Sequence, residues 1–179
     1  FLRKKQFFSY MKHQPKVALL GNYHKTQRSL ITRIFGFFFL DYGVDNSFLI
    51  KDLNNKSEIN KNLAIFTSRS DRNLDLLIQI WKNKIFPNFK NGKLLITPSD
   101  KTINSHNIFP RILSTRENLI RDMCNSRLLL LPGHKAELYC LAAEEGRELC
   151  LPIVTLGIGS LSERVVHGKT GFIAKDADE

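Results

Sequence analysis

Short apolar runs alternate along the chain with polar, turn-forming stretches. The runs predict strands at 16–20, 48–50, 63–66, 94–96, 128–131 and 152–155. Apolar residues at helical spacing predict helices at 25–38, 71–81 and 116–124. This repeated alternation of strand and helix predicts an α/β fold, a Rossmann-like parallel sheet with helices on both faces.

The best candidate for a domain boundary is the polar, turn-forming segment 54–58. We therefore expect residues 1–58 to be an N-terminal segment, or the remnant of a preceding domain with its linker, and residues 59–179 to form a ligand-binding domain. A chain of 179 residues with 42% hydrophobic residues can bury one core.

Segment 133–145, which follows the predicted strand 128–131, is the most informative part of the chain. We expect a helix that begins at Glu137 and includes Glu145. Eight helical residues advance roughly 12 Å and rotate about 80°, which would leave both carboxylates on one side of the helix. They could then hold the two ends of one elongated ligand. A surface helix with two solvated glutamates is the alternative.

The amides of Tyr139, Cys140 and Leu141 would lie in the first turn of this helix. First-turn N–H groups lack helical partners and lie at the positive end of the helix dipole, so they favour an anion. A ligand with hydroxyl groups at both ends and phosphates between them fits this arrangement. A nucleotide diphosphate sugar is such a molecule.

The segments on either side extend the pattern. Strand 152–155 leads into the glycine-rich turn 157–163 and then the turn 167–171, while 66–75 follows the predicted strand at 63–66. Together with the two glutamates, residues 63 to 173 resemble the donor-binding domain of family 4 retaining glycosyltransferases, in the GT-B superfamily of two facing Rossmann-like domains. The resemblance implies a hexosyltransferase-type enzyme that transfers a sugar from a nucleotide diphosphate sugar to an acceptor with retention of configuration.

The resemblance also implies roles for the charged residues. Arg72, with Arg69 as its rival, would neutralise the diphosphate, a task suited to a fixed guanidinium. The family usually adds a lysine from this segment, but the chain reads Arg72-Asn73. Lys135 is therefore a candidate for the second positive charge.

By the same resemblance, Glu145 would hold the ribose hydroxyls and Glu137 would be the catalytic residue, which contacts the donor sugar beside the reacting carbon. Gly157 and Gly159 would allow the backbone to approach the ligand closely. We expect no metal ion and no cofactor, because arginine and helix amides can stabilise the leaving diphosphate electrostatically.

Charge and cysteine content limit the partners and the compartment. The net charge is +10, and residues 1–60 carry 10 Lys/Arg against 4 Asp/Glu. A basic surface can attract nucleic acid, an anionic membrane face or acidic glycolipid acceptors, and a merely solvated basic face is the alternative. The acceptor stays unknown, with a glycolipid or polysaccharide precursor as candidates and peripheral contact with a membrane inner face open. No helix-turn-helix or RNA-binding aromatic pattern is present, so we expect no nucleic-acid partner. Three cysteines without a Cys-x-x-Cys pair predict a cytoplasmic protein.

The longest apolar run, 34–40, is far shorter than the roughly 20 residues needed to cross a bilayer. We therefore expect no transmembrane segment and favour burial of this run, with docking on another domain or a membrane as the alternative. We also expect the chain to be a piece of a longer protein, with its second domain truncated at the C-terminus. Two other functions stay open: a sugar-nucleotide epimerase, and a noncatalytic nucleotide- or polyanion-binding module.

Overall fold

The computed structural model describes residues 4–49, 58–97, 105–112 and 114–178, and the chain divides into two compact units, Phe1–Tyr42 and Gly43–Glu179. The elements of the first unit are α1 (Lys4–His13), β1 (Val17–Leu19), α2 (Asn22–Gln27), α3 (Ser29–Phe35) and β2 (Phe37–Phe39). Strands β1 and β2 pair in parallel, with Val17 opposite Phe37.

The strand predicted at 16–20 is thus confirmed as β1, whereas the single helix predicted at 25–38 is wrong. This segment instead forms α2, α3 and β2. Gly36 ends α3 with φ +71, a backbone conformation that glycine adopts without strain, and the chain then continues as a strand. Burial of the apolar run 34–40 is also wrong for most of its side chains, since Phe38, Phe39 and Leu40 are each about half exposed.

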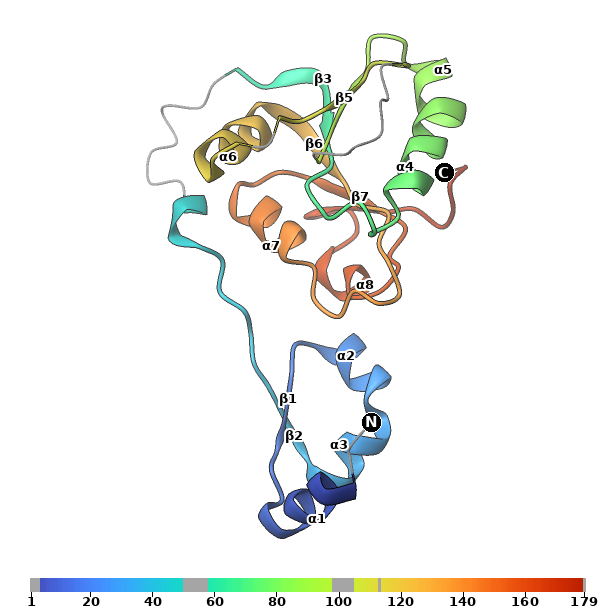
Figure 1. Cartoon of the computed structure of the whole chain (residues 1–179). Helices are drawn as coiled ribbons and strands as arrows, with labels where there is room; N and C mark the ends of the chain where they lie inside the picture. Colours follow the sequence, from blue (N-terminus) through green and yellow to red (C-terminus); the bar gives the residue numbers. More distant parts are fainter. Residues whose placement is uncertain (1–3, 50–57, 98–104, 113, 179) are drawn as a thin grey trace. The chain divides into compact units, whose positions relative to one another are not determined.

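The second unit is built on one parallel sheet of six strands in the order β5-β4-β3-β6-β7-β8 (Figure 1). Its strands are β3 (Asn60–Ile65), β4 (Lys93–Ile96), β5 (Ile108–Pro110), β6 (Ser126–Leu130), β7 (Ile153–Thr155) and β8 (Gly171–Ile173). Its helical elements are η1 (Asn46–Phe48), α4 (Leu74–Ile80), the π-helical turn η3 (Trp81–Ile85), α5 (Phe86–Asn88), α6 (Arg116–Asn125), α7 (Leu141–Glu148) and α8 (Leu161–Arg164). The predicted fold class is confirmed.

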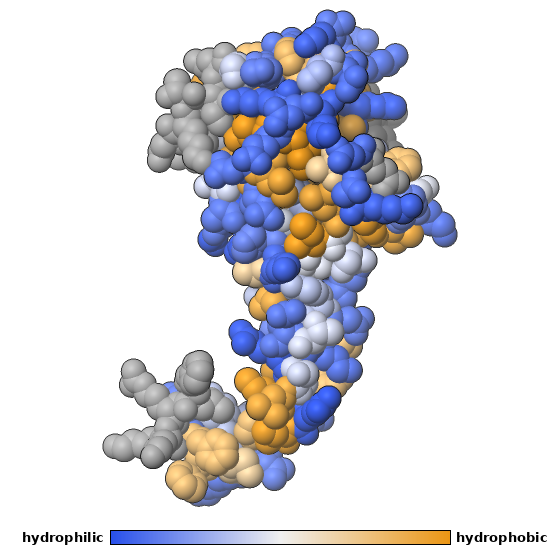
Figure 2. Space-filling view, turned by 90° about the vertical axis from the view of Figure 1, so that its right-hand side faces the viewer, coloured by the Kyte–Doolittle hydropathy of each residue, from blue (hydrophilic) through white to orange (hydrophobic). Residues whose placement is uncertain are grey.

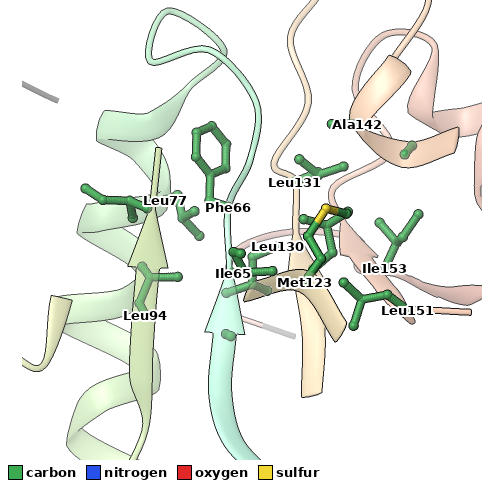
Figure 3. Packing of buried hydrophobic residues seen from close by; sticks show 14 of the residues in the cluster. Ile65, Phe66, Leu77, Leu94, Met123, Leu130, Leu131, Ala142, Leu151 and Ile153 are labelled. Atoms are coloured by element: carbon green, nitrogen blue, oxygen red, sulfur yellow. The ribbon is translucent and has the colours of Figure 1, made fainter. Parts of the chain in front are cut away.

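Helices α4 and α5 lie on one face of this sheet, and α6 and α7 on the other (Figure 1). Right-handed crossovers produce this arrangement, because the chain moves outward in one direction from β3 to β5 and in the opposite direction from β6 to β8. The core fills both interfaces, with Leu77 of α4, Ile65 and Leu94 of the sheet, and Met123 and Ile153 among its buried members (Figure 3).

One face of the sheet also carries an open apolar groove. It is bordered by Leu77 and Ile80 of α4 and by Leu130 and Val154, which are register partners in β6 and β7. Hydrophobic residues reach the surface of this unit in the view of Figure 2, where α4 faces the reader. Phe172, the partner of Val154 in β8, is 58% exposed on the same face.

Several sequence predictions for this unit are confirmed: the strands at 63–66, 94–96, 128–131 and 152–155 and the helix at 116–124 correspond to β3, β4, β6, β7 and α6. The strand at 48–50 is wrong within the described residues, where Phe48 ends a 3-10 turn and is buried as part of the core. Segment 54–58, the expected boundary, lies outside the described residues except for Glu58. The compact units divide after Tyr42.

A buried ion pair joins helices α7 and α8. Glu144 is 2% exposed. Its carboxylate accepts a hydrogen bond of 3.2 Å from Arg164 and forms a second ion pair with Arg147. The Arg164 guanidinium also lies 4.1 Å from the ring centroid of Tyr139, a cation–π contact. The pair therefore connects two helices with the segment that precedes α7.

Removing one partner of this pair should be far more costly than removing both. Glu144→Leu removes the carboxylate that pairs with Arg164, whose side chain is only 13% exposed, so we expect the free energy of unfolding to fall by about 3 kcal/mol. Glu144→Leu combined with Arg164→Met should recover most of that loss, because apolar packing replaces the pair. Urea unfolding followed by the fluorescence of Trp81 measures both, with exposed Glu148→Leu on the same helix as control. A single variant as stable as wild type would contradict the assignment.

Candidate functional site

The candidate site lies at the carboxyl ends of β3 and β6, the adjacent strands at which the chain reverses its direction across the sheet. Ligands of open α/β sheets bind at such a switch point. The loops after the two strands are joined there, because Asn73 Nδ2 donates a hydrogen bond of 2.5 Å to the carbonyl of Gly133. Asn73 adopts φ +61, a conformation in which asparagine is favoured among residues with a side chain. This explains why asparagine follows Arg72.

The two candidate arginines take different positions. Arg72 is mostly buried, with its side chain 20% exposed, and its Nη1 lies 3.4 Å from Nδ1 of His134 in the loop after β6. Arg69 is 74% exposed and donates from Nε to Oδ1 of Asp71 at 3.0 Å, while Arg72 Nε lies 3.9 Å from the same carboxylate oxygen. This hydrogen bond, followed by the charges of both arginines, lowers the pKa of Asp71. Arg72 is therefore the arginine that faces the neighbouring loop.

The loop after β6 packs tightly against the turn after β7. Gly133 and Ile158 form a parallel β-bridge, and the amide of Ser160 donates to the carbonyl of Glu137 at 3.1 Å. A Cβ on Gly159 would lie 2.3 Å from the carbonyl oxygen of His134, and Gly159 has φ +75. Only glycine fits at this position, so the two segments form one closely packed rim.

The expected helix from Glu137 to Glu145 is wrong in its start. Helix α7 begins at Leu141 with Cys140 as its N-cap, and Glu137 lies in the preceding turn, where its amide donates to His134 O at 2.9 Å. The amide of Tyr139 is therefore outside the helix, and the two glutamates do not share a helical face. Leu141 does supply the first N–H of α7.

Glu137 is a buried carboxyl group, 8% exposed. Burial raises its pKa and the charge of Asp71 acts in the same direction, while a hydrogen bond from Cys140 and the charge of Arg72 act in the opposite direction. Burial, together with the charge of Glu137, also raises the pKa of the Cys140 thiol. The thiol is thus a neutral donor to Glu137, whose burial is the largest influence and favours the neutral carboxyl group.

Glu145 lies within α7 and is half-buried. Burial raises its pKa, Arg116 lowers it and Asp45 raises it. Arg116 and Asp45 are hydrogen-bonded to each other and form an ion pair. Sequence reasoning missed both residues, because Arg116 begins α6 and Asp45 precedes η1, and no local motif connects either to Glu145.

The remaining predicted residues lie on the same rim or near it. Lys135 is exposed in the loop after β6, one residue beyond His134. Gly157 has φ +66, and a Cβ there would lie 2.9 Å from Ile173 of β8. Across the described part of the chain, no cluster of three or more His, Cys, Asp and Glu side chains is arranged to hold a metal ion. Within the same part, no helix has the length and apolar character to cross a membrane.

No protein-family model matches the sequence, and neither does any curated protein. Solved structures do match. TarM of S. aureus superposes with a TM-score of 0.73 at 15% identity, over 96% of this chain and 35% of TarM. A glycosyltransferase from Rickettsia africae gives 0.71 at 15% identity, over 98% and 53%. Anabaena HepE, solved in complex with UDP and glucose, gives 0.68 at 12% identity, over 92% and 50%.

These similarities show the fold alone, a Rossmann-like parallel sheet covered by helices, like that in part of each of these glycosyltransferase structures. The chain spans between about a third and a half of the length of these structures. The comparison therefore agrees with the architecture expected from the sequence resemblance.

The two buried glutamates should make the unliganded protein less stable as pH rises. A carboxyl group whose pKa is raised in the folded state contributes stability below its unfolded value, here 4.5, and loses it as pH rises through the folded-state pKa. We expect Glu137→Gln combined with Glu145→Gln to flatten this decline, whereas exposed Glu148→Gln should not. Urea unfolding from pH 4.5 upward measures it, and a decline of equal slope in the double variant would refute the assignment.

Proposed function

We propose that this chain is the donor-binding half of a retaining glycosyltransferase, which binds a nucleotide diphosphate sugar at the switch point between β3 and β6. The observation that supports it most is the contact of Arg72 with His134, in the loop that also carries Glu137. It brings a fixed positive charge and a buried carboxylate to one edge of the sheet. The structure of HepE with UDP and glucose gives a precedent for such a ligand on this fold.

The roles follow from the chemistry of the donor. Cleavage of the bond between sugar and phosphate builds negative charge on the departing diphosphate and positive charge on the sugar. Arg72 would stabilise the diphosphate, together with the first amide of α7 at Leu141. Glu137 would stabilise the cationic sugar, and its buried position strengthens that interaction because little water screens it.

Glu145 would accept hydrogen bonds from the ribose hydroxyls. Its half-buried carboxylate lies beyond the start of α7, and Arg116 offsets part of the cost of burying its charge. The Arg116–Asp45 pair would then support the nucleoside end of the site. Retention of configuration is proposed from the sequence resemblance to retaining glycosyltransferases. The two glutamates, Glu137 and Glu145, are among the residues that show this resemblance.

Arg72 should be needed for the diphosphate and Arg69 should not. Arg72→Ala should weaken binding of UDP, GDP or ADP, whichever the protein takes, by about 1.5 to 3 kcal/mol, the range for hydrogen bonds to charged groups. The matching nucleoside should lose little, since it lacks the charge. Arg69→Ala is the control, being exposed and paired with Asp71. Calorimetry decides, and equal losses for diphosphate and nucleoside would indicate misfolding rather than a phosphate contact.

Substitutions of the two glutamates should affect different quantities, kcat for Glu137 and nucleotide affinity for Glu145. Glu137→Gln keeps the shape but removes the charge, so kcat should fall on the order of 100-fold, the scale of one lost electrostatic contact to a transition state, with nucleotide affinity little changed. Glu145→Gln should weaken nucleotide binding more than it lowers kcat. Steady-state kinetics of sugar transfer in the active protein, combined with calorimetry, measure both. The reverse pattern would exchange the two roles.

A further inference from the structure

The imidazole ring of His134 is held in one tautomer by its neighbours. Its Nδ1 accepts a hydrogen bond of 3.1 Å from the amide of Ala136 and lies 3.4 Å from Nη1 of Arg72. Both neighbours bring hydrogens, and a ring nitrogen that faces N–H donors must present a lone pair. The proton of the neutral ring is therefore on Nε2.

The backbone of His134 is held as firmly as the ring. Its carbonyl oxygen accepts from the amide of Glu137 at 2.9 Å and lies where a Cβ on Gly159 would clash. The side chain is half-buried, so the orientation of the ring is set before any ligand arrives. A donor that is fixed in advance needs no reorganisation when it meets developing charge.

We infer that His134 is a further substrate-contacting residue, which donates its Nε2–H to a non-bridging oxygen of the donor's second phosphate. This inference rests on the proposed function. Through Nδ1 the ring contacts Arg72, assigned to the diphosphate, and the backbone carbonyl of His134 accepts from the amide of Glu137, assigned to the sugar. These two contacts assign the ring to the junction of phosphate and sugar. A hydrogen bond there strengthens as the leaving diphosphate gains charge.

The alternative is that His134 only holds Arg72 in place through Nδ1. Two variants distinguish these roles, because the two ring nitrogens lie at different distances from the backbone. Asparagine has its terminal amide at the distance of Nδ1, so His134→Asn keeps an acceptor for Ala136 and Arg72 but lacks the Nε2 donor. Glutamine reaches the distance of Nε2, so His134→Gln keeps a donor there but loses the Nδ1 acceptor.

The test is calorimetric titration of wild type and both variants with UDP, GDP and ADP and with the corresponding monophosphates. We expect His134→Asn to bind the preferred diphosphate at least about tenfold more weakly than wild type, a hydrogen bond to a charged group being worth at least that much. His134→Gln should lose less. The monophosphate should be affected little by either, because it lacks the second phosphate. Circular dichroism checks that both variants are folded.

If His134→Gln instead bound the diphosphate more weakly than His134→Asn, the residue would act only by holding Arg72. That result would overturn the inference. Equal affinities in all three proteins would overturn it as well, and so would a loss of the same size for monophosphate and diphosphate. Failure of the wild type to bind any of the three diphosphates would refute the proposed function itself, a result that is distinct from these.

Discussion

The site depends on a contact that leaves no room for a side chain. The turn after β7 approaches the loop after β6 so closely that Cβ atoms on Gly133 and Gly159 would lie 2.4 Å and 2.3 Å from carbonyl oxygens of Ile158 and His134. Each glycine faces a carbonyl of the other segment, so the two segments pack directly against each other. The carboxyl edge of the sheet therefore has one rigid rim rather than two independent loops.

This rim accounts for the unusual placement of polar groups nearby. Glu137 is buried, and the charges of Arg72 and Asp71 act on its carboxyl group in opposite directions. The cost of burying a carboxyl group appears as a raised pKa. Carboxyl groups with perturbed pKa values cluster at functional sites, which agrees with the role proposed for Glu137.

A second polar arrangement, the buried ion pair between α7 and α8, also connects segments next to this rim. Glu144 pairs with Arg164, and the Arg164 guanidinium lies over the ring of Tyr139, two residues after Glu137. Since Arg164 ends α8, the helix after the β7 turn, this connection ties the far end of the turn to the segment before α7. The site is thus supported by backbone contact on one side and by a buried ion pair on the other.

Local pattern alone determined the α/β alternation, most of the central strands and the helix α6, because hydrophobic period and strand length are properties of short segments. The roles predicted for Arg72, with Arg69 as its rival, and for Glu137 and Glu145 came from the family resemblance, and they stay predictions. Local pattern could not place the start of α7, where Cys140 caps the helix and Glu137 bonds instead to the loop before it. Nor could it separate Arg72 from Arg69, or find Arg116, Asp45 and the tautomer of His134. Those features depend on contacts between residues distant in sequence, which form only when the strands of the sheet bring their carboxyl ends to one edge.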